Sequence, residues 1–221
     1  MLYIHHAQLL TPTRAIPDGA VLVDGGRIAA AGPAAELPPP EGARRQDIGA
    51  QAIVPLLDVR PGHTVVDLCA APGHKTFQIL EASPRLAIAA DLSPARLATL
   101  PPHWPRVRLD AAEPLPFGPV FDRILVDAPC SGTGTLARNP EIKWRLAPAD
   151  ISAHAARQRR ILAAALAALK PGGKLVYATC SLETRENEDV VRAVAAGRVL
   201  TTMTRLPGRE PGDGFFAAVI S

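Results

Sequence analysis

The pattern of apolar and polar residues changes near residue 45. Before that point, short apolar stretches separated by Pro-Asp-Gly and Gly-Gly lie at 2–10, 20–25 and 26–32. Such stretches predict short β-strands that are joined by turns at these dipeptides and tripeptides. Prolines and charges crowd the stretch 36–45, ELPPPEGARR, which predicts a linker. We therefore expect residues 1–45 to form a short β-rich segment of its own.

From residue 46 onward, continuous apolar runs alternate with stretches of helical periodicity. The runs lie at 63–69, 86–91, 107–110, 122–128 and 174–180. Runs of this kind are typical of strands that are buried on both faces of a parallel sheet. Two later runs, 198–206 and 214–220, predict a terminal hairpin. The expected fold class is α/β: a doubly wound Rossmann-like sheet with a C-terminal β-hairpin, over residues 46–221.

Signals for helix starts and stops lie between the apolar runs. Ser93 offers an N-cap and is followed by proline at the first helical position. Leucines recur with helical spacing over 150–170, and the Pro-Gly-Gly that follows at 171–173 predicts the end of this helix. The stretch 185–197 begins with acidic residues, which suit a helix N-terminus.

Composition and charge narrow the possible classes of protein. The net charge of +3 over 221 residues permits a polyanionic partner without requiring one. No apolar run reaches the roughly 18 residues that a membrane span needs, and the first residues lack the pattern of a secretion signal. Three cysteines argue against a disulfide framework. We therefore expect reduced thiols, no membrane association and a cytoplasmic location.

The turn after the first strand of the larger domain predicts a small-molecule pocket. Residues 69–75, Cys-Ala-Ala-Pro-Gly-His-Lys, lead into a helix at the carboxyl end of a strand, where doubly wound sheets bind ligands. A phosphate-binding P-loop is excluded, because Cys69 and His74 stand where that motif has glycine. The Gly-x-Gly-x-x-Gly pattern of dinucleotide sites is also missing.

Aspartates end the next three strands and indicate which ligand the pocket takes. Asp91 suits ribose hydroxyls, because a carboxylate can accept two hydrogen bonds from a diol. Asp110 could accept from an adenine amino group, and Asp127 completes the set. Without a phosphate cradle, these residues fit S-adenosylmethionine, with Lys75 within reach of its carboxylate. The alternative is that each aspartate only caps the helix after its strand.

Two cysteines supply the candidate chemistry. Cys130 and Cys180 follow strands that are separated by one long helix, and a right-handed crossover makes such strands neighbours. Both thiols are therefore expected beside the pocket. A thiolate that adds to carbon 6 of a pyrimidine activates carbon 5 toward a methyl group, and a base must then remove the carbon-5 proton. A zinc site made of the cysteines and His74 is an alternative without Cys-x-x-Cys spacing, and inert buried thiols are another.

Four segments carry a specific resemblance: VVDLCAAPGHKT, LVDAPCSGTGTLARNPEIKWR, YATCSLETRENEDVV and DGFFAA. They are similar to the RNA (cytosine-5)-methyltransferases of the RsmB/Sun type, which include the NSUN proteins, over about residues 46–221. The resemblance implies methylation of carbon 5 of cytosine in RNA, with 16S ribosomal RNA favoured, through a covalent cysteine–cytosine adduct. It implies that Cys180 attacks, that Cys130 assists release of the product, and that Asp127 touches the target base. The implied cofactor-binding residues are Cys69, Ala70, Ala71, Pro72, Gly73, His74, Lys75, Asp91, Asp110 and Asp127.

The loop after Cys130 offers candidate contacts to the RNA. Arg138, Lys143, Trp144 and Arg145 could grip phosphates around a flipped-out cytosine, next to an aromatic ring. A solvated basic loop is the alternative.

Some features depart from the resembled family and keep alternatives open. His74 stands where the family usually has a second glycine, and no N-terminal RNA-binding region is visible. Residues 1–45 instead resemble the opening strands of amidohydrolases but lack the His-x-His metal motif, so we expect no metal site and no catalytic role there. The alternatives are a catalytically weak RNA-binding remnant, a tRNA-directed cytosine-5 methyltransferase and a metal hydrolase fragment. Cys130 stays the second candidate nucleophile, because DNA cytosine-5 methyltransferases attack with the cysteine of a Pro-Cys motif.

Overall fold

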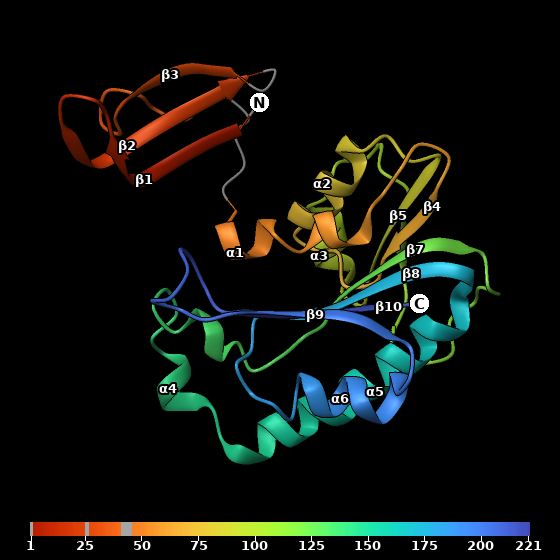
Figure 1. The fold of residues 1–221 in the computed structure, drawn as a ribbon. Helices are drawn as coiled ribbons and strands as arrows, with labels where there is room; N and C mark the ends of the chain where they lie inside the picture. Colours follow the sequence, from red (N-terminus) through yellow and green to blue (C-terminus); the bar gives the residue numbers. More distant parts are fainter. Residues whose placement is uncertain (1, 25–26, 41–45) are drawn as a thin grey trace. The chain divides into compact units, whose positions relative to one another are not determined.

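Two compact units make up the chain, Met1–Arg45 and Gln46–Ser221. The computed structural model describes residues 2–24, 27–40 and 46–221. Figure 1 shows both units as ribbons, and each is described below by itself.

The smaller unit is an antiparallel sheet of three strands in the order β1-β2-β3. The strands are β1 (Leu2–Leu10), β2 (Ala15–Asp24) and β3 (Arg27–Pro33). The predicted Pro-Asp-Gly turn is wrong, because residues 17–19 lie inside β2 and the chain turns before Ala15 instead. The pairing of β1 with β2 shifts register between Ala7 and Leu9, and an irregularity of this kind tolerates a proline in a strand. The predicted Gly-Gly turn and the last five residues of the predicted linker, 41–45, lie outside the described residues.

The larger unit is built around a seven-stranded sheet in the order β6-β5-β4-β7-β8-β10-β9. Its strands are β4 (Thr64–Asp67), β5 (Leu86–Asp91), β6 (Arg106–Arg108), β7 (Phe121–Asp127), β8 (Leu169–Thr179), β9 (Val199–Arg205) and β10 (Phe215–Ile220). Strands β4 to β8 pair with one another in parallel, whereas β10 is antiparallel to both β8 and β9. The predicted doubly wound sheet with a C-terminal hairpin is therefore confirmed.

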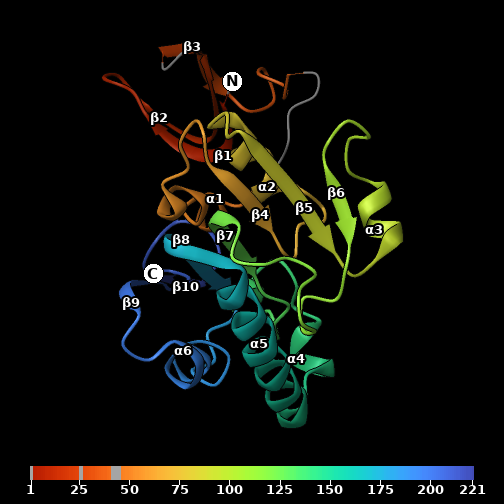
Figure 2. The ribbon, with the colours of Figure 1, turned by 90° about the vertical axis from the view of Figure 1, so that its right-hand side faces the viewer.

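Helices cover both faces of this sheet, as the two views in Figures 1 and 2 show. They are α1 (Ile48–Gln51), η1 (Val54–Leu57), α2 (His74–Glu81), α3 (Pro94–Ala98), η2 (Thr133–Thr135), α4 (Ile142–Arg145), α5 (Pro148–Ala168) and α6 (Glu188–Ala195). Helices α5 and α6 pack against one face, and η1 and α2 pack against the other. Ser93 caps α3 as predicted, since its Oγ accepts a hydrogen bond from the Arg96 N–H at 3.3 Å.

The apolar runs are buried on alternating sides of the sheet. In β4, Val65 packs with the η1 and α2 side, whereas Val66 packs with the α5 and α6 side. In β8, Val176 and Tyr177 divide in the same way, and both are fully buried. Successive side chains of a strand point to opposite faces, so a strand between two helical layers must be apolar throughout. This is why these strands read as unbroken apolar runs.

The predicted end of the long helix is wrong. Helix α5 ends at Ala168, and Leu169–Thr179 forms β8, so the Pro-Gly-Gly at 171–173 lies within a strand. Leu169 already pairs with Phe121 of β7, and the register then shifts before Lys174 pairs with Arg123. The irregularity accommodates the proline and Gly172, whose φ is +74°. Pairing with β7 thus takes over two residues that helical spacing had assigned to the helix.

Candidate active site

The carboxyl ends of four parallel strands form one rim of the sheet. Asp67, Asp91 and Asp127 are the last residues of β4, β5 and β7, and Cys180 directly follows β8. Cys130 lies in the loop after β7, which pairs with β8. The predicted adjacency of these two strands is confirmed, and polar side chains from distant parts of the chain meet at this rim.

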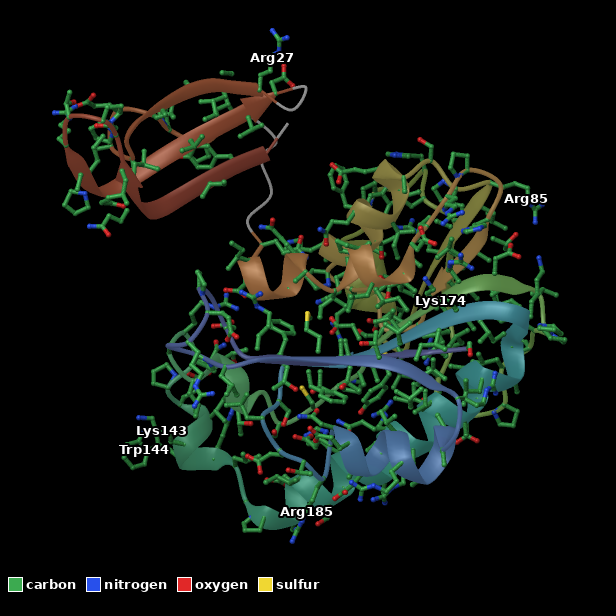
Figure 3. All side chains as sticks on the ribbon, viewed as in Figure 1. Arg27, Arg85, Lys143, Trp144, Lys174 and Arg185 are labelled. Carbon is green, nitrogen blue, oxygen red and sulfur yellow. The ribbon has the colours of Figure 1, made fainter. Side chains whose placement is uncertain are left out.

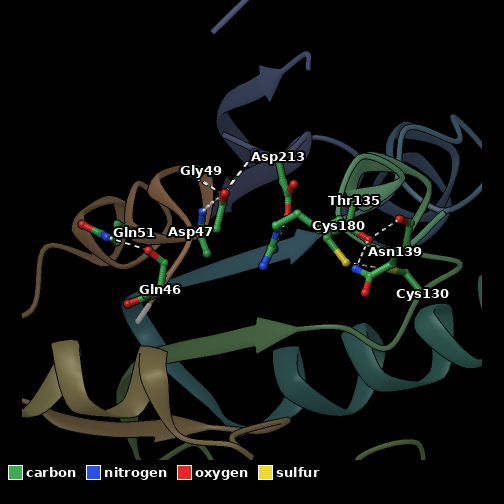
Figure 4. Close-up of polar contacts among 12 residues, drawn as sticks. Gln46, Asp47, Gly49, Gln51, Cys130, Thr135, Asn139, Cys180 and Asp213 are labelled. Atoms are coloured by element: carbon green, nitrogen blue, oxygen red, sulfur yellow. Dashed lines mark hydrogen bonds and ion pairs between the residues drawn. The ribbon is translucent and has the colours of Figure 1, made fainter. Parts of the chain in front are cut away.

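The structure brings the two predicted thiols together. Cys130 Sγ lies 3.4 Å from Cys180 Sγ, a hydrogen-bonding distance for sulfur, and both residues are half-buried rather than enclosed in the core (Figure 4). Neither takes part in a disulfide bond. The rim thus holds two free thiols that are joined by one hydrogen bond.

Lys75 and Asp127 form an ion pair at the same rim. Lys75 Nζ donates to Asp127 Oδ2 at 2.7 Å, and Nζ also lies 5.5 Å from the centre of the Phe215 ring. Burial acts to lower the pKa of Lys75, but Asp127, with a further contribution from Asp67, holds that pKa above its usual range. Lys75 therefore stays charged beside the thiols. The predicted ligand carboxylate would therefore meet a Lys75 ammonium that is already paired with Asp127.

The two thiols differ in their protonation. The Cys130 S–H donates to Cys180 and lowers the pKa of the Cys180 thiol; burial and Asp127 oppose this, and the Lys75 charge supports it. The same hydrogen bond raises the pKa of Cys130 well above its usual range, as do burial and the negative charge of Glu186. We take Cys130 as the donor because the Glu186 carboxylate raises its pKa, whereas at Cys180 the Lys75 ammonium offsets part of the effect of Asp127. Cys180 is accordingly the thiol of the pair that loses its proton more readily.

Gly134 ties the Cys130 loop to the Cys180 loop. Its N–H donates to the Cys180 carbonyl at 2.9 Å, and its own carbonyl accepts from the Gly214 N–H at 2.8 Å. A Cβ atom at position 134 would collide with the carbonyl oxygen of Gly214 and would lie 2.9 Å from that of Cys180. Only glycine allows three backbone segments to approach this closely.

The predicted cofactor turn lies between β4 and α2. Ala70, Ala71 and Gly73 are buried, Pro72 is exposed, and the Ala71–Pro72 peptide bond is cis. Gly73 has a φ of +96°, and a Cβ there would lie 2.5 Å from Leu100 Cδ2. The turn is therefore held tightly against Leu100 and Trp104, and its own side chains are small.

Cys69 and His74 flank this turn. Burial raises the pKa of the Cys69 thiol, with Asp67 as the next cause, so Cys69 stays protonated and is not a nucleophile. His74 is half-buried at the first position of α2.

The predicted ribose and adenine carboxylates are partly engaged by the protein. Asp91 accepts hydrogen bonds from the Ala71 N–H at 3.2 Å and from the Ser93 N–H at 2.9 Å. Asp110 accepts from the Ala112 N–H at 2.9 Å. Neither aspartate caps a helix, because Ser93 caps α3 and the described residues between Asp110 and η2 form no helix. A carboxylate offers about four lone-pair positions, so both residues keep the capacity to accept from a ligand.

Asp67 is a residue of this site that sequence reasoning missed. Its Oδ2 accepts from Thr76 Oγ1 at 2.7 Å, whereas its buried Oδ1 has no partner among the described residues. Burial raises the pKa of Asp67 to about 7. An orphaned acceptor at the head of the turn fits a ligand that brings donor groups, such as the ammonium of an amino acid. The signal was present in the sequence, since Asp67 ends its strand as Asp91 and Asp127 end theirs.

The candidate RNA contacts divide into engaged and free side chains. Arg138 forms an ion pair with the buried Asp213, and Arg145 lies 3.8 Å from Glu141. Lys143 and Trp144 point away from α4 (Figure 3), and Trp144 is 87% exposed. The chain therefore holds an aromatic ring and a lysine in solvent close to the Cys130 loop.

Metal and membrane features were searched in the parts of the chain that the structure describes. Over residues 2–24, 27–40 and 46–221, no group of three or more His, Cys, Asp or Glu side chains could hold a metal ion. None of the helices described has both the length and the apolar character needed to cross a bilayer.

Comparison with known proteins identifies the family. The family described as 16S rRNA methyltransferase RsmB/F matches residues 54–200, more than half of the chain. The chain belongs to the RsmB/F family. Ribosomal RNA small subunit methyltransferase B of Yersinia pseudotuberculosis is 42% identical over 196 residues, which is 79% of this chain and 46% of that protein. The chain thus spans about half the length of the curated RsmB relatives it matches.

Solved structures of similar proteins agree with this membership. The crystal structure of NSun6 from Pyrococcus horikoshii with SFG is 27% identical, has a TM-score of 0.71, and covers 79% of this chain and 52% of its own. A methyltransferase homolog from the same organism is 29% identical with a TM-score of 0.66, over 79% and 66% of the two chains. The resemblance predicted from the four motifs is confirmed. In the first unit, residues 19–39 match an imidazolonepropionase-like composite domain of bacteria.

Proposed function

We propose that this protein methylates carbon 5 of cytosine in RNA, with 16S ribosomal RNA as the favoured substrate and S-adenosylmethionine as the methyl donor. The observation that carries the proposal is the pair of free thiols, 3.4 Å apart, beside the Lys75–Asp127 ion pair. Membership in the RsmB/F family supports it. The relatives named for small-subunit ribosomal RNA support the choice of substrate.

We assign the attack to Cys180. Its thiolate is favoured by the Cys130 S–H and by Lys75, so it forms the bond to carbon 6 of the cytosine and pushes electron density onto carbon 5. Asp127, paired with Lys75, offers a carboxylate oxygen to the amino group on carbon 4. A flipped-out cytosine would thus be held on the edge opposite to the attacked carbon.

We assign the release step to Cys130. After methylation, a base removes the proton from carbon 5, the ring double bond is restored, and the sulfur of Cys180 leaves carbon 6 as a thiolate. Cys130 Sγ lies 3.4 Å from the departing sulfur, and its proton restores the hydrogen bond that stabilises that thiolate. The raised pKa of Cys130 keeps this proton available.

The turn at residues 69–75, together with Asp91 and Asp110, is the proposed cofactor site. When bound, S-adenosylmethionine supplies a methyl group on a positively charged sulfur. The orphaned Oδ1 of Asp67 and the spare lone pairs of Asp91 and Asp110 are acceptors that match the donor groups of an amino acid and a nucleoside. The half-buried His74 borders this site. The resembled family usually has glycine there, so this chain places a larger side chain beside the proposed cofactor.

Lys143 and Trp144 are the proposed contacts to the strand that carries the target. An exposed indole stacks on an unpaired base, and an adjacent lysine attracts phosphates. Both lie on α4, whose buried Ile142 would be 3.2 Å from a Cβ at Gly132 in the Cys130 loop. A base stacked on Trp144 would therefore lie at a fixed distance from the Cys130 loop.

Transfer of tritiated methyl groups to RNA tests the proposal. The full chain is incubated with labelled S-adenosylmethionine and either protein-free 16S ribosomal RNA or bulk tRNA, with Cys180→Ala as the inactive control. We expect label in the ribosomal RNA, and bisulfite sequencing then locates the methylated cytosine. Label in tRNA alone would overturn the choice of substrate. Binding of RNA and cofactor without any transfer would replace the proposal by an RNA-binding remnant.

A further inference from the structure

A buried carboxylate lies behind the two thiols and takes no direct part in the bond-making and bond-breaking steps described above. Glu186 is completely buried, although it belongs to the charged stretch Arg185–Asp189. We infer that Glu186 is a positioning residue that holds the Cys130 and Cys180 loops in register, so that their sulfur atoms stay within contact. This inference deepens the proposed function, because it concerns the same two thiols.

The side chain of Glu186 binds the residue after each cysteine. Its Oε1 accepts from the Ser131 N–H at 2.9 Å, and its Oε2 accepts from Ser181 Oγ at 2.5 Å and from Ser131 Oγ. The two serine oxygens are also 3.1 Å apart. One carboxylate thus connects two loops that are far apart in the sequence.

Two neighbouring amides complete the grip on both cysteines. Gln158 Nε2 donates to Glu186 Oε1 at 3.2 Å and to the carbonyl of Pro129, the residue before Cys130, at 2.9 Å. Asn187 Nδ2 donates to the Ser181 carbonyl at 2.9 Å. Asn187 Oδ1 accepts from Thr179, the residue before Cys180, at 2.5 Å. Each cysteine is therefore fixed on both sides by Glu186 or by a residue bound next to it.

The backbone of Glu186 is itself fixed to the sheet. Tyr177 of β8 is fully buried, and its hydroxyl donates to the Glu186 carbonyl at 2.6 Å. The position of the carboxylate is therefore set by the strand that leads to Cys180. A thiol pair held in this way needs no rearrangement before attack, and small displacements of catalytic groups are costly for rate.

Disulfide trapping tests the inference without RNA or cofactor. Wild-type protein, Glu186→Ala and Glu186→Gln are treated with diamide well below their melting temperatures, and the Cys130–Cys180 disulfide is followed by mass spectrometry. In Glu186→Ala the serine donors lose their acceptor, and we expect the disulfide to form about tenfold more slowly. Glutamine keeps the size and can hydrogen-bond both serines, so Glu186→Gln should stay within about threefold of wild type.

The matched control is Glu188→Ala, which removes an exposed carboxylate two residues away. It should cross-link at the wild-type rate. A folded Glu186→Ala that cross-links as fast as wild type would overturn the inference. If Glu186→Ala does not fold, Ser131→Ala and Ser181→Ala, each lacking one arm, take its place with the same criterion. With an RNA substrate, Glu186→Ala should lower kcat and leave KM for RNA close to wild type. Wild-type protein that cross-links as expected but methylates no RNA would refute the proposed function without contradicting the positioning role of Glu186.

Discussion

Cys130 and Cys180 sit in loops that look alike and differ in charge. Each follows a parallel strand, each is followed by serine, and both serines bind Glu186. Cys180 lies beside the Lys75–Asp127 ion pair, whereas Cys130 lies beside the buried carboxylate of Glu186. The pKa of Cys180 is thereby lowered and that of Cys130 raised, which is the basis for proposing Cys180 as the thiolate and Cys130 as its proton donor. Similar local sequences thus acquire different chemistry from the charges that the fold places behind them.

The largest expected effect comes from removing the thiolate. In Cys180→Ala, no covalent bond to carbon 6 can form, so we expect methyl transfer to fall by at least about a thousandfold. No protein–RNA adduct should appear on denaturing gels. Glu188→Ala is the control, since it removes an exposed side chain outside the proposed site. Adduct formation by Cys180→Ala would reverse the roles of the two cysteines.

Removing the proton donor should give the opposite signature. In Cys130→Ala, attack is slower because Cys180 loses the donor that lowers its pKa, but methylation still proceeds. The departing Cys180 thiolate lacks the same donor, so release is the step most impaired. We expect a covalent protein–RNA adduct to accumulate and multiple turnover to fall by about a hundredfold. The adduct is measured on denaturing gels against time, with the Cys130→Ala, Cys180→Ala double variant as the control. Free turnover without adduct would show that release does not depend on Cys130.

A change at Lys75 should shift the balance between the thiols without deleting either. Loss of its charge raises the pKa of Cys180, and Asp127 then acts unopposed in the same direction. In Lys75→Met we expect about tenfold less activity at neutral pH, equivalent to about one pKa unit, with recovery as the pH rises. The pH–rate profile measures this shift, and Lys75→Arg should keep the wild-type profile. An unshifted pH–rate profile in Lys75→Met would show that the charge of Lys75 does not affect the pKa of Cys180.

The smallest expected effect is a difference in alkylation between the thiols of the wild-type protein. A lowered pKa gives thiolate at lower pH, so iodoacetamide should modify Cys180 before Cys130 as the pH is raised from acid. We expect at least about a threefold difference in rate near neutral pH, read by peptide mass spectrometry. Faster modification of Cys130 would invert the assignment of donor and thiolate.

Most of the fold could be predicted from local patterns, because the central strands are buried on both faces. Residues 86–91 read as a strand and form β5, and Ser93 reads as a cap and caps α3. The pattern failed where pairing between strands overrides local signals. Pro-Gly-Gly at 171–173 lies within β8, because pairing with β7 begins at Leu169.

The site could be predicted as far as its thiols, and less well in its supporting charges. Cys130 and Cys180 each follow a recognisable strand, and topology then makes them neighbours. Glu186 lies in an acidic run that is typical of a solvated helix start, and only packing against Tyr177 and Gln158 shows it to be buried. Lys75 pairs with Asp127, which is 52 residues away in the sequence. Partners that are distant in sequence leave no local signal.

The position of β10 has a consequence for how the nascent chain assembles. β9 lies at the edge of the sheet and reaches β8 only through β10, which is synthesised after it. Gly214, just before β10, also bonds to Gly134 in the Cys130 loop. Residues 214–220 must therefore be synthesised before the two thiols, which are synthesised earlier, acquire their final surroundings. Until then the nascent chain carries both thiols but not the backbone contact that joins their loops to the last strand.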